Sequence, residues 1–323
     1  TNTDTCDVDA TVAQIRALEG VGADIVRVSV PTMDAAEAFG KIRKQVSLPL
    51  VADIHYDYKI ALKVADEGAD CLRINPGNIG REDRVRAVIE SARDHGVPIR
   101  IGVNAGSLEK HLLDRYGGAT PEAIVESGLR HLAMLERRGF YETKISLKAS
   151  DVTRTVGAYR IMASRVDYPL HLGITEAGGL RTGTVKSSIG MGSLLWAGIG
   201  DTIRVSLTLP FAEKWREVEV GQGILEDIET GRFRSVPDFL EGGLNIISCP
   251  SCSRVENEAF IELAQDVKTM TTYAKEHDIT IAVMGCRVNG PGETDDADLG
   301  LWCAPTFVNL KRGEEDLGAF PYA

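Results

Sequence analysis

The sequence predicts an α/β chain: a TIM-type (β/α)8 barrel followed by a small α/β domain. From Asp24 to Thr208, short β-branched apolar runs alternate with amphipathic stretches rich in Ala, Leu, Glu and Arg, which is the pattern of parallel strands connected by helices. The runs are apolar almost throughout, as in strands that are buried on both faces. Polar residues gather just after each run. This favours a barrel, whose active site lies at the ends of all its strands, over an open doubly wound sheet, which stays the alternative.

Seven segments are predicted to be strands of the barrel: Ile25–Val30, Leu50–Ile54, Cys71–Asn75, Ile99–Asn104, Lys144–Lys148, Leu170–Thr175 and Thr202–Leu207. The helices expected between them are Val8–Val21, Ala35–Val46, Tyr58–Glu67, Arg81–Asp94, Pro121–Arg138 and Thr153–Arg165. Several helices end at a glycine, for example Gly68, which suits a left-handed cap. A barrel of this type has eight strands, and the chain opens with a loop and a helix. We therefore expect the first strand to lie upstream of Thr1.

A change of pattern after residue 210 predicts the second domain. Residues 1–210 form the expected barrel, and residues 211–243 are charged and irregular, which indicates a linker with one helix. Residues 244–323 form the small domain, which we expect to be clipped at its C-terminus because no closing helix follows the last strand. Its expected elements are a strand at Leu244–Ser248, a helix over Asn257–Glu276 and strands at Ile279–Met284, Leu299–Cys303 and Thr306–Leu310.

Charge and composition exclude several classes of function. The net charge of −11 argues against a nucleic-acid partner, although local arginines can still bind a small anion. Six cysteines are too few for a disulfide scaffold in 323 residues. We find no signal peptide and no apolar run long enough to span a bilayer, so we expect a cytoplasmic protein without a membrane partner. The chain opens on Thr1 rather than Met, which leaves an organellar targeting segment open.

Three cysteines of the second domain have the spacing of metal ligands. Cys249 and Cys252 lie in a Cys-Pro-Ser-Cys turn, and Cys286 follows in a loop that reads Gly-Cys-Arg-Val-Asn-Gly-Pro-Gly-Glu and ends at Glu293. Two thiolates two residues apart and a third from a distant turn suit an iron–sulfur cluster. Three thiolates leave one iron without a sulfur ligand, and the carboxylate of Glu293 could bind it. A displaceable oxygen ligand would make the cluster a catalyst as well as an electron relay.

Zinc is the main competitor for these thiolates. A closed structural zinc site needs a fourth ligand, for which His277 and Cys303 are the candidates. His277 stands nine positions before Cys286, and Cys303 follows Trp302 in an expected strand, where a thiol is often inert and buried. The combination of the turn and the loop favours the iron–sulfur cluster.

Cationic side chains concentrate at the ends of the predicted barrel strands. Arginine forks and lysine charges at this density suit a small, multiply charged anion such as a diphosphate. The alternative to anion binding is that individual cations only form ion pairs with Asp or Glu residues of neighbouring strands. The strand-end residues are Arg27, Asp53, His55, Arg73, Asn75, Arg100, Asn104, Lys148, His171 and Arg204, and Lys186 is also expected to follow a strand, in the basic stretch Arg181–Ser187.

The roles of two further residues after these strands stay undecided at this point. Glu176 is either a proton donor in a site of low water content or a salt-bridge partner of Lys148 or Arg204. His55 is either a hydrogen-bond donor to phosphate or, together with Asp53, part of a metal pair that lacks an obvious third ligand.

With these residues in view, the chain resembles the family of 4-hydroxy-3-methylbut-2-enyl diphosphate synthases. The resemblance covers Thr1 to about Gly300, and both cysteine motifs match. One departure is Leu301-Trp302-Cys303, which stands where a Gly-Gly pair is expected. The other matching stretches are Val51–His55, Leu72–Asn78, Ile99–Asn104, Leu172–Gly178 and Gly200–Ser206.

The resemblance implies an oxidoreductase of the non-mevalonate (MEP) pathway of isoprenoid and terpenoid biosynthesis. It would convert 2-C-methyl-D-erythritol 2,4-cyclodiphosphate into 4-hydroxy-3-methylbut-2-enyl diphosphate with two electrons from ferredoxin or flavodoxin. It also implies a head-to-tail homodimer in which the cluster domain of one subunit caps the barrel of its partner. The sequence does not choose between the two electron donors.

The resemblance also implies a role for each candidate residue. Cys249, Cys252 and Cys286 would hold a [4Fe-4S] cluster with Glu293 on the fourth iron, and Glu176 would be the proton source. The residues that fit the substrate-binding mouth are His55, Arg73, Asn75, Arg100, Asn104, Lys148, Lys186 and Arg204.

Two functions of other classes are the alternatives. A pterin-type barrel methyltransferase with a structural zinc domain would bind zinc tightly and show no iron–sulfur absorbance. A non-enzymatic iron–sulfur carrier would transfer its cluster and would not bind a cyclic diphosphate. The density of cations at the strand ends argues against both.

Overall fold

The computed structural model describes residues 1–230, 243–251, 255, 257–295 and 297–322. The chain divides into two units, Thr1–Leu225 and Glu226–Ala323. Cys252 lies outside the described residues. None of the helices in the described residues is both long and apolar enough to cross a membrane.

The first unit alternates strands and helices. Its strands lie in sequence order: β1 (Val26–Ser29), β2 (Leu50–Asp53), β3 (Cys71–Ile74), β4 (Ile99–Asn104) and β5 (Thr143–Lys148) form one parallel sheet, and β6 (His171–Leu172) and β7 (Thr202–Ile203) form a parallel pair. Pairing between β7 and β1 does not occur among the described residues. Parallel strands in sequence order with helices between them are the arrangement predicted for the barrel.

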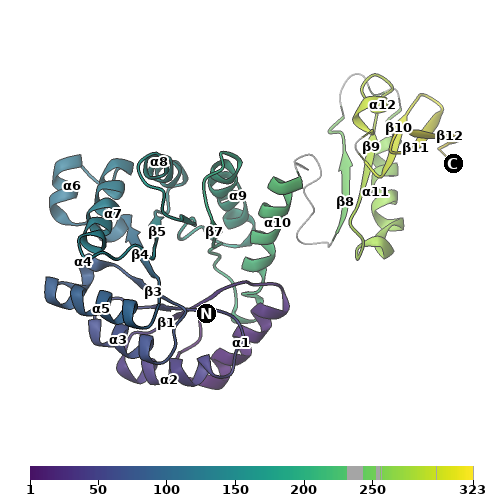
Figure 1. Cartoon of the computed structure of the whole chain (residues 1–323). Helices are drawn as coiled ribbons and strands as arrows, with labels where there is room; N and C mark the ends of the chain where they lie inside the picture. Colours follow the sequence, from purple (N-terminus) through teal and green to yellow (C-terminus); the bar gives the residue numbers. More distant parts are fainter. Residues whose placement is uncertain (231–242, 252–254, 256, 296, 323) are drawn as a thin grey trace. The chain divides into compact units, whose positions relative to one another are not determined.

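Helices form a layer outside these strands (Figure 1). The layer begins at α1 and ends at α10, where the side chain of Gln222 donates a hydrogen bond of 3.1 Å to the carbonyl of Gly22 just after α1. The helices are α1 (Val8–Gly20), α2 (Met33–Arg43), α3 (Tyr58–Asp66), α4 (Pro76–Ile79), α5 (Glu82–Asp94), α6 (Lys110–Tyr116), α7 (Pro121–Glu136), α8 (Val152–Ala163), α9 (Leu180–Trp196) and α10 (Arg216–Thr230).

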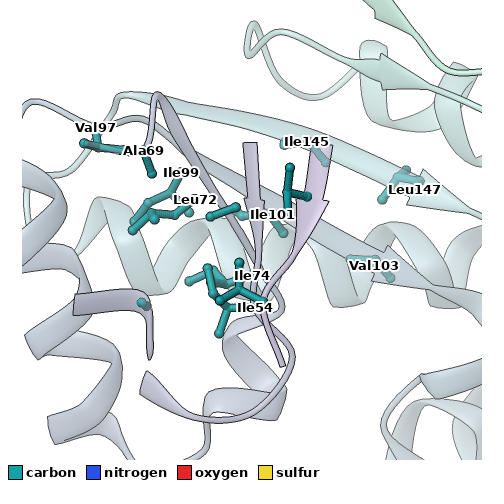
Figure 2. Close-up of a cluster of buried hydrophobic side chains, with 14 of the residues drawn as sticks. Ile54, Ala69, Leu72, Ile74, Val97, Ile99, Ile101, Val103, Ile145 and Leu147 are labelled. Carbon is teal, nitrogen blue, oxygen red and sulfur yellow. The ribbon is translucent and has the colours of Figure 1, made fainter. Parts of the chain in front are cut away.

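The apolar residues of the strands form the core of this unit. Leu72 and Ile74 of β3, Ile99 and Ile101 of β4 and Ile145 of β5 are all fully buried and lie close together (Figure 2). Burying each such side chain contributes about 1.5–3 kcal/mol. This packing fixes the strands, and therefore also fixes the positions of the polar residues at their ends.

A tyrosine joins the sheet to the β6–β7 pair. In the described backbone, β5 and this pair are connected by one isolated bridge, Ile145 to Leu170, and just beyond their ends by a hydrogen bond of 3.1 Å from the amide of Thr175 to the carbonyl of Ala149. The fully buried hydroxyl of Tyr159 on α8 accepts a hydrogen bond of 2.9 Å from the amide of Leu147 and donates one to the carbonyl of His171. A side-chain hydroxyl thus satisfies backbone groups that a continuous ladder would otherwise pair.

The second unit is a mixed sheet with helices. Its strand order is β12-β11-β10-β9-β8, with β8, β9 and β10 parallel and the last two pairings antiparallel. The strands β8, β9 and β10 have the predicted bounds. The elements are β8 (Leu244–Ser248), α11 (Phe260–Met270), β9 (Ile279–Met284), α12 (Gly290–Glu293), β10 (Leu299–Cys303), β11 (Phe307–Arg312) and β12 (Glu315–Pro321).

The helix expected over Asn257–Glu276 is shorter than predicted. It ends at Met270 and continues as a 3-10 turn over Thr272–Ala274. Near its end, the hydroxyls of Thr269 and Thr271 each donate to the carbonyl four residues earlier. Such bonds compete with the helical ladder and favour termination.

Candidate active site

Three cations lie on neighbouring strands of the first unit. Arg73 of β3 is opposite Arg100 of β4 in the register, and Lys148 ends β5 opposite Asn104. All three side chains belong to buried residues, at 9%, 5% and 7% exposure. Buried like charges repel one another and lose hydration, so this cluster is unfavourable without an anion.

Asp53 is the acid that faces this cluster. One carboxylate oxygen lies 3.0 Å from Arg27 and the other 2.9 Å from Arg73. Burial raises the pKa of this carboxyl, but the two arginines outweigh burial and hold it below its ordinary value. One carboxylate thus balances two guanidinium groups and leaves positive charge in the mouth.

Several guanidinium donors in the mouth have no acceptor. The buried Nε of Arg73 and the Nε and Nη2 of Arg100 have no hydrogen-bond partner in the described part of the chain. Gly102 of β4 makes room for the first of them, since a Cβ at that position would lie 2.3 Å from the Nε of Arg73. Buried donors without acceptors cost about 1–3 kcal/mol each. The mouth is therefore arranged for a ligand that supplies acceptor oxygens.

The pKa values of the mouth have a common cause. Burial, and then the repulsion of Arg27, Arg73, Arg204 and Arg100, lowers the pKa of Lys148 to about 6. Burial lowers the pKa of Arg100 to about 10 and that of Arg204 below its ordinary value.

His171 responds to the same surroundings. Burial and the neighbouring cations hold its pKa well below 6.5, and its Nδ1 lies 2.8 Å from the hydroxyl of Thr202. A neutral imidazole can donate only one hydrogen bond at a time.

Two asparagines of the predicted site hold the loops that follow their strands. The side-chain oxygen of Asn75 accepts from the amide of Gly77 at 3.0 Å, and that of Asn104 accepts from Gly106 at the same distance. Each asparagine thus ends its strand with a tight turn. The loops after β3 and β4 are built in the same way.

Two other predicted barrel residues, His55 and Lys186, are less buried than this cluster. His55 is exposed in the loop after β2, with its ring centroid 6.3 Å from that of Tyr56. Lys186 is half-buried within α9 rather than at a strand end.

Glu176 is exposed in the loop after β6. The ion pairs among the described residues do not join Glu176 to Lys148 or Arg204. It has a left-handed backbone with φ of 53°, and Ser251 with φ of 71° is the other non-glycine residue with this conformation in the described chain. Such strain concentrates at functional loops. The two residues fall in the loop after β6 and in the Cys-Pro-Ser-Cys turn.

The two described thiols of the predicted cluster site follow neighbouring parallel strands. Cys249 comes directly after β8 and Cys286 two residues after β9. Carboxyl ends of parallel strands meet at one edge of a sheet. The amide of Gly285 donates to the sulfur of Cys249 at 3.2 Å, a contact of the kind that tunes iron–sulfur clusters.

Glu293 lies in a loop that the sheet holds firmly. It ends α12, and the side-chain amide of Asn289 donates to its carboxylate at 3.4 Å. Lys311 of β11 donates to the carbonyl of Pro291 at 3.2 Å. A Cβ on Gly290 would lie 2.5 Å from the Cβ of Trp302. Trp302, which stands where the family resemblance predicts a Gly-Gly pair, therefore packs against this loop.

This donor set fits the implied cluster. No group of three possible metal ligands occurs among the described residues, which do not include Cys252. His277 precedes β9 whereas Cys286 follows it, so a six-residue strand separates this zinc candidate from the thiol. Cys303 is buried beside Phe260 and Val308, and burial raises the pKa of its thiol. Thiolates with one carboxylate are donors that suit an iron–sulfur cluster better than a closed zinc site.

Arg27 belongs to the cationic cluster, although it was not predicted to bind the substrate. It was expected among the strand-end cations but not in the substrate-binding mouth. Its ion pair with Asp53 and its effect on the pKa values of Lys148 and Arg204 bring it into the cluster. The signal was its position, because Arg27 lies in β1 one strand away from Asp53.

Comparison with known proteins decides the family. Residues 1–222 match the GcpE TIM-barrel domain, and residues 245–318 match the GcpE protein C-terminal domain. The chain belongs to the GcpE family. This confirms the expected synthase family and the predicted barrel fold with a separate C-terminal domain.

Three relatives of this chain carry the same name. Proteins of Chromohalobacter salexigens and Marinobacter nauticus are each 61% identical to this chain, over 307 and 305 residues, and the matches cover 93% of this chain and 77% of each relative. One of Azotobacter vinelandii is 60% identical over 301 residues, covering 93% and 78%. Each is named 4-hydroxy-3-methylbut-2-en-1-yl diphosphate synthase (flavodoxin). The main reading of the sequence is thus supported, and the methyltransferase and carrier alternatives are not.

Among solved structures, Yersinia pestis dihydropteroate synthase is similar with a TM-score of 0.46 at 12% identity, over 70% of this chain and 89% of that one. This similarity is too low to bear on function.

Proposed function

We propose that this chain reduces 2-C-methyl-D-erythritol 2,4-cyclodiphosphate to 4-hydroxy-3-methylbut-2-enyl diphosphate. The bond between the ring phosphate oxygen and the tertiary carbon breaks, the neighbouring hydroxyl leaves as water, and a carbon–carbon double bond forms. Two electrons and one proton enter for each ionised substrate molecule. The diphosphate stays attached through its remaining ester.

The buried, unsatisfied guanidinium donors of the barrel mouth carry this proposal. Arg73 and Arg100 together present three buried nitrogen atoms without acceptors. A cyclic diphosphate supplies anionic oxygens to such donors and relieves the repulsion that lowers the pKa of Lys148. Arg27, Arg204, Asn75 and Asn104 complete the mouth. Fixing both phosphates also fixes the reacting carbon atoms and stabilises the phosphate oxygen that is released.

A [4Fe-4S] cluster is the cofactor that we propose for the second unit. Cys249, Cys252 and Cys286 would be its thiolate ligands and Glu293 its oxygen ligand. When bound, such a cluster supplies electrons one at a time and a Lewis-acidic iron. The amide of Gly285, 3.2 Å from the sulfur of Cys249, would stabilise negative charge on this thiolate.

Glu176 is the proposed source of the proton. It is exposed at the mouth end of β6, and its loop is strained by the left-handed backbone at this residue. A carboxylic acid so placed could protonate the departing hydroxyl and take up a proton again from solvent. His55 and Lys186 are proposed as outer contacts of the diphosphate, since neither belongs to the buried cluster.

Flavodoxin is the proposed electron donor, because the relatives carry it in their name. We also propose a homodimer in which the cluster unit of one subunit caps the barrel of the other. Co-expression of Arg100→Met with Cys286→Ala tests this arrangement, because a mixed dimer of this kind retains one intact pairing. Recovery of activity supports the arrangement, and two inactive variants that stay inactive together argue against it.

The decisive experiment uses anaerobic protein whose iron and sulfide have been measured. With reduced flavodoxin and the cyclodiphosphate, we expect formation of the linear diphosphate. Arg100→Met should weaken calorimetric binding of the cyclodiphosphate by ~100-fold, since a buried charged hydrogen bond contributes about 1.5–3 kcal/mol and Arg100 has several donors. Arg115→Met is the matched control, because Arg115 is an exposed arginine paired with Glu126. Protein without iron and sulfide, or without affinity for the cyclodiphosphate, overturns the proposal.

A further inference from the structure

A pair formed by a buried histidine and a half-buried carboxylate has no part in the steps above. His131 on α7 is 2% exposed, and its Nε2 lies 3.3 Å from a carboxylate oxygen of Glu109. The second oxygen of Glu109 accepts from the hydroxyl of Ser127 at 2.8 Å. The contact with His131 is the main reason why the pKa of Glu109 is lowered to about 2. Ser127 and His131 are four residues apart and therefore lie on one face of α7.

One end of this pair touches the loop after β3. A Cβ on Gly77 would lie 2.9 Å from the Nε2 of His131 and 3.3 Å from the side-chain oxygen of Asn75. The imidazole thus packs against the backbone of the turn that Asn75 holds. Gly77 itself is exposed, so it has the imidazole on one side and solvent on the other.

The other end anchors the loop after β4. Glu109 stands five residues after Asn104 and immediately before α6, where its carbonyl accepts from the amides of Leu112 and Leu113 at 2.9 and 3.1 Å. A shift of Glu109 would therefore move both α6 and the turn at Asn104.

The platform for both contacts is rigid. At Gly128, between Ser127 and His131, α7 packs so closely that a Cβ would lie 2.7 Å from Met162 and 3.3 Å from Leu147 of β5. Both ring nitrogens of His131 are buried without a hydrogen-bond partner among the described residues, and burying an imidazole in this way costs more than burying an apolar side chain of the same size. An interaction that is costly for stability and connects two loops of the mouth suggests a role in function.

We propose that the Glu109–His131 pair is a positioning device. It couples the loops after β3 and β4, and holds Asn75 and Asn104 at the spacing that the diphosphate requires. This inference rests on the proposed function, because it concerns binding of the same diphosphate. Neither Glu109 nor His131 needs to touch the substrate.

The first test changes each contact with little change in volume. Gly77→Ala inserts one methyl group against the imidazole, and Glu109→Gln keeps the size of the side chain but removes its charge. We expect the calorimetric dissociation constant for the cyclodiphosphate to rise about tenfold or more in both, since displacements near 1 Å have effects up to about 100-fold. The kcat should change less than the KM, because Glu176 and the cluster ligands are untouched.

Arg115→Gln is the matched control for this test. It breaks an ion pair of 2.9 Å between α6 and α7 on the exposed side of the same two helices. Its dissociation constant should equal that of the wild type. If Arg115→Gln weakens binding as much as Glu109→Gln does, general loosening of α6 explains the result and the proposal is wrong.

A double-mutant cycle distinguishes positioning from simple destabilisation. His131→Ala removes the group that the new methyl at residue 77 meets, so Gly77→Ala should weaken binding much less in that background than alone. Additive effects, or dissociation constants within twofold of the wild type in both first-test variants, overturn the inference. Failure of the wild type to bind the cyclodiphosphate is a separate outcome, which overturns the proposed function and this inference with it.

Discussion

Replacing Gly102 by alanine should displace the guanidinium of Arg73 from its position in the mouth while the charge of Arg73 is kept. The new Cβ would lie 2.3 Å from the Nε, 2.6 Å from the Nη2 and 2.7 Å from the Cζ of Arg73. An ordinary contact between carbon and nitrogen needs roughly 3.5 Å, so the guanidinium must move by about 1 Å. That movement also strains its ion pair of 2.9 Å with Asp53.

The expected effect falls on binding more than on stability. A displacement near 1 Å can weaken a positioned contact up to ~100-fold. Overpacking costs about 1–3 kcal/mol, while replacing a strand glycine by alanine returns about 0.5–1 kcal/mol. We therefore expect the dissociation constant for the cyclodiphosphate to rise by one to two orders of magnitude, with a loss of stability of at most about 2.5 kcal/mol. Titration calorimetry and urea unfolding measure the two quantities.

Two comparisons make this result interpretable. Gly192→Ala on α9 is the control, because a Cβ there meets no atom within 4 Å. In an Arg73→Ala background, Gly102→Ala should have almost no further effect on binding. Wild-type affinity of the single variant Gly102→Ala would refute the argument that Arg73 must lie across β4 to bind the ligand.

Three further predictions concern charge in the mouth and at the cluster. Lys148, with a pKa of about 6, is neutral in the free protein at pH 8. A bound anion raises this pKa, so binding takes up a proton and the affinity for the anion rises as the pH falls toward 6. The binding enthalpy of the wild type should therefore depend on the ionisation enthalpy of the buffer. A binding enthalpy that is the same in all buffers contradicts this. Asp53→Asn leaves Arg27 and Arg73 without their carboxylate and should lower the free energy of unfolding by about 3–5 kcal/mol. In a thermal shift assay, pyrophosphate should restore part of this loss. Unchanged stability argues against the double ion pair. Glu293→Ala should keep the circular dichroism spectrum, change the paramagnetic resonance of the reduced protein and lower turnover ~100-fold, whereas full activity excludes Glu293 as a ligand.

Sequence patterns predicted the elements whose signal is local. The strand β4 and the three parallel strands of the second unit have the predicted bounds, because each is a short segment rich in Ile, Val or Leu. The strand β12 was missed, since its sequence Glu-Asp-Leu-Gly-Ala-Phe-Pro contains acidic residues, a glycine and a proline, which are rare in strands. It forms because β11 pairs with it along its length. Tertiary pairing outweighed the intrinsic preference.

The candidate site was predictable as a set of residue types but not as an arrangement. The strand ends gave the cations, because all parallel strands of a barrel point their carboxyl ends to one side. The close approach of Arg73 to Gly102 depends on the register in which Arg73 faces Arg100, and no local pattern contains that register. The same holds for Asp53, whose two arginines come from β1 and β3. Lys186 shows the converse, since its basic stretch suggested a strand end but lies within α9.

The phenol of Tyr159 places a large part of the connection between β5 and β6 on a single oxygen atom. A backbone ladder distributes its strength over many amides, whereas β5 and β6 are connected by one bridge, by one bond from Thr175 to Ala149 beyond the strand ends, and by this hydroxyl. Loss of that oxygen would leave one buried amide and one buried carbonyl without a hydrogen-bond partner, and each would lower the free energy of unfolding by about 1–3 kcal/mol. The β6–β7 pair, which leads into the Glu176 loop, can thus separate from the rest of the wall as a unit. Local opening of this unit would then begin beside the loop of Glu176, while the strands that carry Arg27, Arg73 and Arg100 stay paired.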